Sequence, residues 1–169
     1  SSVKAQPIQW FCIGGTPAQA VYQHSSPSGH HERETNLFVG NPFMSIIPGE
    51  MSFVGVHAPG GPDALTLRKA PAPTPAAGEV LIKVHAAGVN GADLREREGK
   101  YPVPPGAPDI LGLEVSGEIV AVGELCDRFR PGDMVCALLI GGGYAEYAIA
   151  PEGQCMAIPD GVSVIDAAG

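Results

Sequence analysis

Glycine and proline interrupt this chain so often that long helices are excluded from most of it. The 169 residues include 23 Gly and 17 Pro, almost a quarter of the chain. Both residue types mark turns and break regular elements, so this content favours short strands joined by loops. Apolar residues make up 44% of the chain, and its length suits one ordinary domain, so a buried core can form. The composition therefore predicts a β-rich domain.

Charge and cysteine content exclude several classes of partner. The formal net charge is -8, with ten Lys and Arg and no basic run, whereas binding to nucleic acid or to an anionic membrane surface requires a cationic patch. The longest apolar run, residues 134–140, is too short to span a bilayer. The four cysteines form no C-x-x-C pair, which we interpret as free thiols in a reducing compartment. We expect a cytoplasmic protein with neither a nucleic-acid nor a membrane partner.

The first fifty residues differ in character from the rest. Residues 1–50 mix Pro, Ser, Gly and Gln with isolated aromatics and show no period of 2 or 3.6. The spacing of Cys12, His24, His30 and His31 matches no standard zinc pattern. We interpret this segment as a disordered or spurious extension, with Met51 as the natural start.

From Met51 onward the pattern predicts strands. Residues 53–57 and 65–68 flank a Pro-Gly-Gly-Pro turn and predict a hairpin. Residues 79–87 alternate, with Leu81 and Lys83 on the face opposite Val80 and Ile82, which predicts a half-buried strand. Further strands are expected at residues 113–122, with a bulge or close backbone approach at Gly117, and at 134–140, 144–150 and 155–158.

Two short segments predict helix starts. Asn90 to Asp93 opens a polar helix that runs to about Glu98, and its Arg95 and Arg97 are expected to be solvated. Ser163 to Asp166 resembles a capping box. Many short strands with one small helix predict a compact barrel or sandwich over residues 51–162. Residues 163–169 are expected to begin a helix that leads to a missing domain.

Five short sequence motifs, taken together in their order along the chain, are specific enough to indicate a protein family. They are Gly88-Val-Asn-Gly-Ala-Asp-Leu94, Gly99-Lys-Tyr-Pro102, Gly112-Leu-Glu-Val-Ser-Gly117, Phe129-x-x-Gly-Asp-x-Val135 and Gly143-Tyr-Ala-Glu-Tyr147. In this order they resemble the N-terminal GroES-like domain of medium-chain dehydrogenases/reductases. Within that superfamily they resemble the zinc-free quinone oxidoreductases, closest to those induced by a tumour suppressor. The resemblance covers residues 51–169 and implies a mainly β, partly open barrel with short helices, truncated before an α/β Rossmann domain.

Two positions separate this chain from the zinc-dependent relatives it resembles. Asn90 stands where those relatives have a Cys, and Leu113 stands where they have a His. Leu has no lone pair, and a neutral amide oxygen replaces thiolate poorly. The resemblance therefore implies that no metal binds here.

The resemblance also implies an activity for the full-length parent. It implies hydride transfer from NADPH, bound by the missing domain, to a small-molecule quinone, in an enzyme that forms a homo-oligomer. A quinone is already an electrophile, so positioning in a dry cleft suffices without a metal. The fragment alone is expected to be inactive. A zinc-free enoyl-thioester reductase and a non-catalytic GroES-like binding module stay open as alternatives.

The candidate site residues follow from the same strings. Tyr101 is the catalytic candidate at the cleft mouth, where it contacts substrate or donates a proton, unless it is an exposed loop aromatic. Asn90 either hydrogen-bonds near the nicotinamide or simply caps the helix. Asp93 is expected to stabilise its loop. Glu114 is expected to pair with an arginine, which the missing domain could supply.

The glycine run at residues 141–143 has a plainer interpretation. It lies between two predicted strands and no helix N-terminus follows it, so a phosphate-binding role is disfavoured. We expect a tight turn near the cleft.

Overall fold

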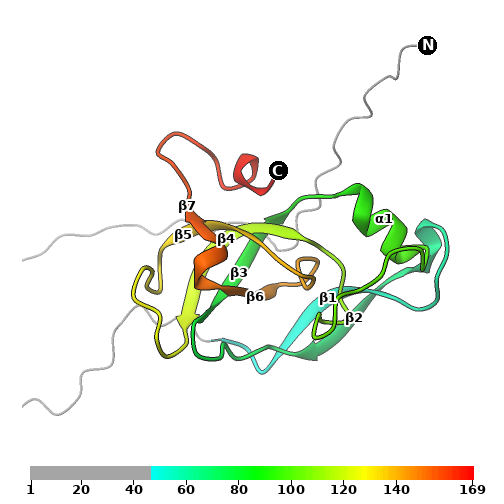
Figure 1. Cartoon of the computed structure of the whole chain (residues 1–169), viewed down its shortest axis with the longest axis horizontal. Helices are drawn as coiled ribbons and strands as arrows, with labels where there is room; N and C mark the ends of the chain where they lie inside the picture. The colour runs from blue at the N-terminus through cyan, green and yellow to red at the C-terminus, as the bar shows by residue number, and fades with distance from the viewer. Residues whose placement is uncertain (1–46) are drawn as a thin grey trace, which may run out of the picture.

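The computed structural model describes residues 47–169 (Figure 1). The predicted extension over residues 1–50, with Cys12 and its three histidines, lies outside the described residues except for its last four. The first strand begins at Glu50, next to the predicted domain start at Met51. The described elements, in order, are β1 (Glu50–Val56), η1 (Pro62–Ala64), β2 (Leu65–Pro71), β3 (Glu79–Ala87), α1 (Gly91–Arg97), β4 (Glu114–Val122), β5 (Met134–Leu138), β6 (Tyr147–Pro151), η2 (Glu152–Gln154), β7 (Cys155–Ala157) and η3 (Asp166–Ala168), where η marks a 3-10 helix.

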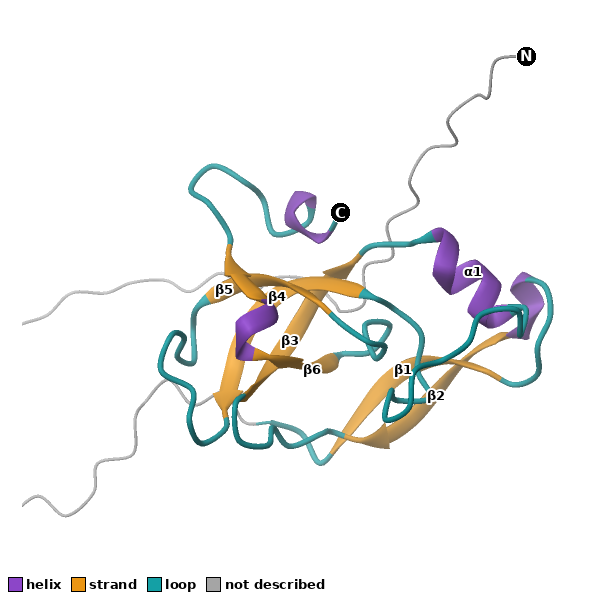
Figure 2. Ribbon diagram, in the orientation of Figure 1, coloured by secondary structure: helices purple, strands orange, loops and turns teal. Residues whose placement is uncertain are grey.

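The strands form two antiparallel sheets that join into a curled, partly open barrel. The larger sheet has the order β6-β3-β4-β5-β7, and β1 pairs with β2. A bridge between Phe53 and Ala145 connects the two sheets, and Val54 N–H donates to the Tyr144 carbonyl oxygen at 2.8 Å. Figure 2 shows the β1–β2 hairpin beside the larger curled sheet. The mainly β fold predicted from the sequence is confirmed.

The predicted hairpin is confirmed in position. Phe53 pairs with Arg68, and η1 begins at Pro62 in the connecting turn. Met51 and Phe53 are buried with Ala145 in a small core where the hairpin meets the larger sheet. The hairpin is therefore anchored by the inward-facing side chains of β1.

The main core lies along β3 and β4. It contains Val80, Ile82, Ile119 and Val135, all fully buried. The expectation that β3 is half-buried is wrong at Leu81, whose exposed fraction is 0%, although Lys83 two residues later is exposed. Leu81 pairs with Ala121 on one neighbouring strand and with Ile149 on the other. These three apolar side chains lie on the second face of the sheet, so the central strand is apolar on both faces at this position.

Gly117 confirms the predicted close approach. The β3–β4 register shifts between Val84 and Ala86, directly opposite Gly117 and Ser116. A Cβ atom added to Gly117 would overlap the carbonyl oxygen of Lys83, well inside van der Waals contact. Only glycine fits there, because the neighbouring group is backbone inside a paired strand.

Glu152 holds a surface loop in place. Its carboxylate accepts the backbone N–H groups of Arg128 at 3.0 Å, Phe129 at 3.1 Å and Asp127 at 3.3 Å. Burial opposes its ionisation, but the hydrogen bonds from these N–H groups outweigh burial and hold the pKa of Glu152 below its usual value. The loop before β5 is thereby attached to the β6–β7 connection.

Replacing Glu152 with glutamine is expected to lower stability in a pH-dependent manner. A carboxylate with a depressed folded pKa contributes stability above its unfolded pKa of about 4.3, and that contribution disappears as pH falls through the folded pKa. Urea unfolding of both proteins from pH 7 to pH 3 should show a difference in unfolding free energy that shrinks in this acidic window. A difference that is constant with pH would contradict the assignment.

The end of the chain returns across the sheet. Asp166 N–H donates to Ser163 Oγ at 3.1 Å, which is one of the two bonds of the predicted capping box. The Asp166 carboxylate accepts from the Ser163 hydroxyl and not from its N–H, and the 3-10 helix η3 has Ile165 as its N-cap. Ser116 Oγ donates to the carbonyl oxygen of Val164, which holds this segment against β4. Among the helices that the structure describes, none has the length and apolar character needed to cross a membrane.

Candidate functional site

The start of α1 is stabilised by its own residues. Asn90 is the N-cap in an extended conformation, and its N–H donates to Asp93 Oδ2 at 2.7 Å. In this bond the side chain at the third helical position accepts the backbone N–H of the N-cap residue, as in a capping box. Both the predicted cap role of Asn90 and the predicted loop-stabilising role of Asp93 are seen in this geometry.

Asp93 is the most deeply buried acid of this region. Its exposed fraction is 2%, and Oδ2 also accepts a hydrogen bond from Tyr144 Oη at 2.9 Å. Tyr144 Oη lies 3.4 Å from the carbonyl oxygen of Gly88 as well. The other carboxylate oxygen, Oδ1, is buried and has no partner. The hydroxyl of Tyr144 therefore holds this buried carboxylate in place.

The side chain of Asn90 reaches the first residue of β4, Glu114. Its Nδ2 donates to Glu114 Oε1 at 2.8 Å. Within residues 47–169 the partner of Glu114 is thus an amide and not the arginine expected from the sequence; an arginine supplied by a further domain stays a prediction. Asn90, Asp93, Glu114 and Tyr144 form one connected set, which we call the Asn90 network.

A close approach of two glycines places Tyr144. Gly112 has a φ of +104° and its carbonyl oxygen accepts Gly143 N–H at 3.0 Å. A Cβ atom on Gly112 would lie 2.7 Å from Gly143 Cα. Gly141 and Gly142 also have positive φ, at +145° and +93°. The run is therefore the tight turn that the sequence predicted, and it sets the direction of the tyrosine that follows.

The electrostatic surroundings keep Tyr144 protonated. Burial raises the pKa of its phenol first, and the neighbouring carboxylates of Asp93, Glu114 and Glu96 raise it further. Tyr144 is consequently a hydrogen-bond donor across the physiological pH range. Sequence reasoning missed this residue, although it stands within the Gly-Tyr-Ala-Glu-Tyr string that carried the resemblance.

Tyr101 lies apart from the Asn90 network. It is 36% exposed, stands at the start of the loop that ends at Ile110, and makes no side-chain hydrogen bond within the described part of the chain. The structure thus brings Asn90, Asp93 and Glu114 together and leaves Tyr101 outside that group.

Arg97 corrects a second expectation. Its side chain is only 12% exposed, and Nε donates to the Gly60 carbonyl oxygen at 3.1 Å, while Gly60 N–H donates to the Arg97 carbonyl oxygen at 3.0 Å. It was expected to be solvated, but this arginine joins the end of α1 to the loop after β1. Arg95 is exposed, as predicted.

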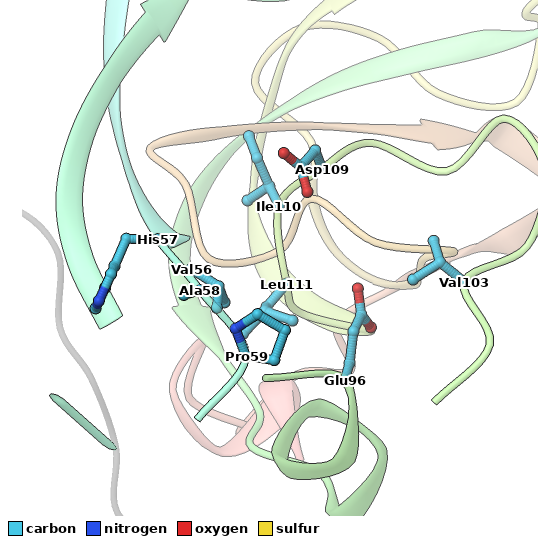
Figure 3. Close-up of a pocket in the computed structure, with 9 residues that line it drawn as sticks. All are labelled: Val56, His57, Ala58, Pro59, Glu96, Val103, Asp109, Ile110 and Leu111. Atoms are coloured by element: carbon cyan, nitrogen blue, oxygen red, sulfur yellow. The ribbon is translucent and has the colours of Figure 1, made fainter. Parts of the chain in front are cut away.

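A pocket of about 230 Å³ adjoins the Asn90 network (Figure 3). It lies between the end of β1, helix α1 and the proline-rich loop of residues 101–110. Its wall consists of Val56, His57, Ala58, Pro59, Glu96, Val103, Asp109, Ile110 and Leu111. Leu111 connects it to the network directly, because its carbonyl oxygen accepts Tyr144 N–H at 2.9 Å.

The donor set at the two positions that distinguish zinc-dependent relatives does not suit zinc. Asn90 uses its side-chain N–H toward Glu114, and Leu113 carries no ligand atom. Elsewhere in residues 47–169, His, Cys, Asp and Glu side chains form no group of three or more that could hold a metal ion.

The family is shown by a match over half of the chain. Residues 76–160 match the model of the alcohol dehydrogenase GroES-like domain, and the chain belongs to that family. Several of the curated relatives that it resembles are named quinone oxidoreductases. The quinone oxidoreductase of Sus scrofa is 41% identical over 112 residues, which are 65% of this chain and 34% of the relative. The chain thus spans about a third of the length of the curated relatives it matches.

Solved structures also resemble this chain in fold. The human synaptic vesicle membrane protein VAT-1 homolog-like protein is 35% identical, with a TM-score of 0.66 over 70% of this chain and 38% of its own. The quinone oxidoreductase from Coxiella burnetii is 30% identical, with a TM-score of 0.64 over 70% of this chain and 40% of its own. The CurK enoyl reductase is 28% identical, with a TM-score of 0.63 over 72% of this chain and 39% of its own.

Proposed function

We propose that this chain is the substrate-side part of an enzyme that transfers a hydride from NADPH to a quinone without zinc. The relatives named quinone oxidoreductases support the substrate class. The single observation that carries the zinc-free part is the state of Asn90, whose amide is bound to Glu114 while a leucine stands before that glutamate. We extend the proposal to a cytoplasmic homo-oligomer, on the resemblance and on the free thiols of Cys126, Cys136 and Cys155.

The residues of the Asn90 network suit a cofactor-side role. Asn90 Nδ2 donates to Glu114, and the Asn90 side chain accepts the Asp93 N–H in the capping box. An amide oxygen has two lone pairs, so it can accept a second hydrogen bond from the N–H₂ group of a nicotinamide carboxamide. NADPH, when bound, supplies the hydride. Asp93 and Tyr144 fix the backbone of Asn90, so the amide is positioned before the cofactor arrives. In this proposal Tyr101 contacts the substrate from the proline-rich loop and donates a hydrogen bond.

The experiment uses the complete protein that contains this chain. We expect it to oxidise NADPH with 1,4-naphthoquinone, to prefer NADPH to NADH, and to contain less than stoichiometric zinc by atomic absorption. Replacing Asn90 with alanine should raise the KM for NADPH roughly tenfold, as expected for losing one hydrogen bond to the cofactor together with its positioning. Stoichiometric zinc bound through this half, or no quinone reduction, would overturn the proposal.

One other function has a specific observation in its favour. The CurK enoyl reductase shares this fold, and hydride transfer to an enoyl thioester needs the same placement of nicotinamide and acceptor. Oxidation of NADPH with an enoyl thioester, but not with any quinone, would favour that function. A folded complete protein that is inactive with both would favour a binding module.

A further inference from the structure

The pocket beside the Asn90 network has a mixed lining of polar and apolar surface. Val56, Pro59, Val103 and Ile110 supply much of its lining, and Glu96 and Asp109 supply its carboxylates. The two acids come from different segments, Glu96 from α1 and Asp109 from the proline-rich loop. Figure 3 shows the Glu96 carboxylate extending from α1 into the space between Val103 and Asp109.

No ion pair neutralises these two carboxylates within residues 47–169. The salt bridges there join Arg97 and Lys100 to Glu98, and Arg130 to Asp133. The one basic ring in the pocket wall is that of His57, whose Nδ1 is 2.8 Å from the Ala64 carbonyl oxygen. The charges that face the pocket are therefore negative.

Neighbouring carboxylates act on Glu96. Burial raises the pKa of Glu96 first, and the charges of Asp93 and Asp109 raise it further. In a partly enclosed space such charges are screened less than at an open surface. An anionic ligand group in this pocket would meet the same repulsion.

We propose that Glu96 and Asp109 determine substrate specificity by admitting an uncharged substituent of the quinone into the pocket and rejecting an anionic one. This inference rests on the proposed function, since it names which quinones the site accepts. The pocket is linked to that site through Leu111, whose carbonyl oxygen accepts Tyr144 N–H at 2.9 Å. Along the chain, Glu96 follows Asp93 by three residues on α1, and Val103 follows Tyr101 by two. Sulfonated quinones and the phosphate-bearing thioesters of coenzyme A would both be disfavoured.

The kinetic test compares 1,4-naphthoquinone with its 2-sulfonate in the complete protein. Within each variant, the ratio of the two kcat/KM values cancels any effect that acts equally on both quinones, such as a change in active-enzyme concentration or in cofactor binding. In Glu96→Gln and in Asp109→Asn the relative kcat/KM of the sulfonate should rise roughly threefold to tenfold, and further in the double variant. The value for the neutral quinone should stay within about twofold, and 0.5 M salt should shrink the effect.

A matched charge change elsewhere controls for the net charge of the chain. Glu124→Gln removes one exposed carboxylate from the loop before β5 and should leave the ratio unchanged. A ratio that does not move in the double variant, or that moves equally in Glu124→Gln, would overturn the specificity proposal while leaving quinone reduction intact.

A second measurement applies if no quinone is reduced, in which case the proposed function fails. The 169-residue chain is labelled at its methyl groups, and a cationic or an anionic nitroxide is added. The relaxation rates of the Val103 and Ile110 methyl signals are then compared between the two nitroxides by NMR. The cationic probe should enhance relaxation several times more than the anionic probe, and Glu96→Gln with Asp109→Asn should reduce that difference. Equal enhancement by the two probes in the unsubstituted chain would overturn the negative pocket.

Discussion

Alanine in place of Gly117 is expected to lower the free energy of unfolding by about 3 kcal/mol, the cost of overpacking a site that cannot relax. The added methyl group would overlap the Lys83 carbonyl oxygen. That oxygen belongs to the backbone of β3, which is paired on both sides, so it cannot move without disturbing the register of three strands. The clash lies at the bulge that gives the sheet its curl.

Urea unfolding of the chain measures this effect. The matched control is Gly153→Ala, because a Cβ atom there meets nothing within 4 Å and the residue does not have a positive φ. We expect the control to change the unfolding free energy by less than about 0.5 kcal/mol. A Gly117→Ala protein as stable as the control would show that the β3–β4 bulge can move to accept a side chain.

Alanine in place of Asp93 is expected to cost about 3 kcal/mol as well. The substitution leaves the Tyr144 hydroxyl and the Asn90 N–H without their shared acceptor in a buried position, and each unsatisfied group costs about 1–3 kcal/mol. Tyr144→Phe removes one hydrogen bond but leaves Asn90 satisfied, so it should cost only about 1 kcal/mol. The two effects should not add, because both variants break the same bond.

A double-mutant cycle tests this coupling. Unfolding free energies of the single variants and of the Asp93→Ala, Tyr144→Phe double variant should give an interaction energy of about 1 kcal/mol. Asp160→Ala, which removes an exposed carboxylate, is the control and should be nearly neutral. Strict additivity, or an Asp93→Ala protein as stable as the Asp160→Ala control, would mean that the buried network does not stabilise the helix start.

The elements with local signals were predicted well from the sequence. Residues 79–87 form β3 with the expected bounds, since a clean alternation between turn residues needs no distant information. The start of α1 at Asn90 also followed from neighbours, because the N-cap and Asp93 lie three residues apart. Gly117 was recognised because a glycine inside a strand pattern is costly unless another group approaches.

What the sequence did not reveal depends on contacts between distant residues. Asn90 meets Glu114 across 24 positions and Asp93 meets Tyr144 across 51, and no periodicity reports such pairs. Arg97 is held by Gly60, 37 positions earlier, so its place on a polar helix misled the prediction. The strand expected at residues 144–150 begins at Tyr147, since residues 144–146 bond to β1 instead.

The attachment of the β1–β2 hairpin has a mechanical consequence for the pocket. Residues 56–59, which form one wall, continue directly from β1. β1 is held to the larger sheet by the Phe53–Ala145 bridge and by hydrogen bonds to Tyr144 and Glu146, and the loop after it by Gly60 and Arg97. That wall is thus held by contacts at its two ends, and a tilt of the hairpin against the larger sheet would change the width of the pocket opening.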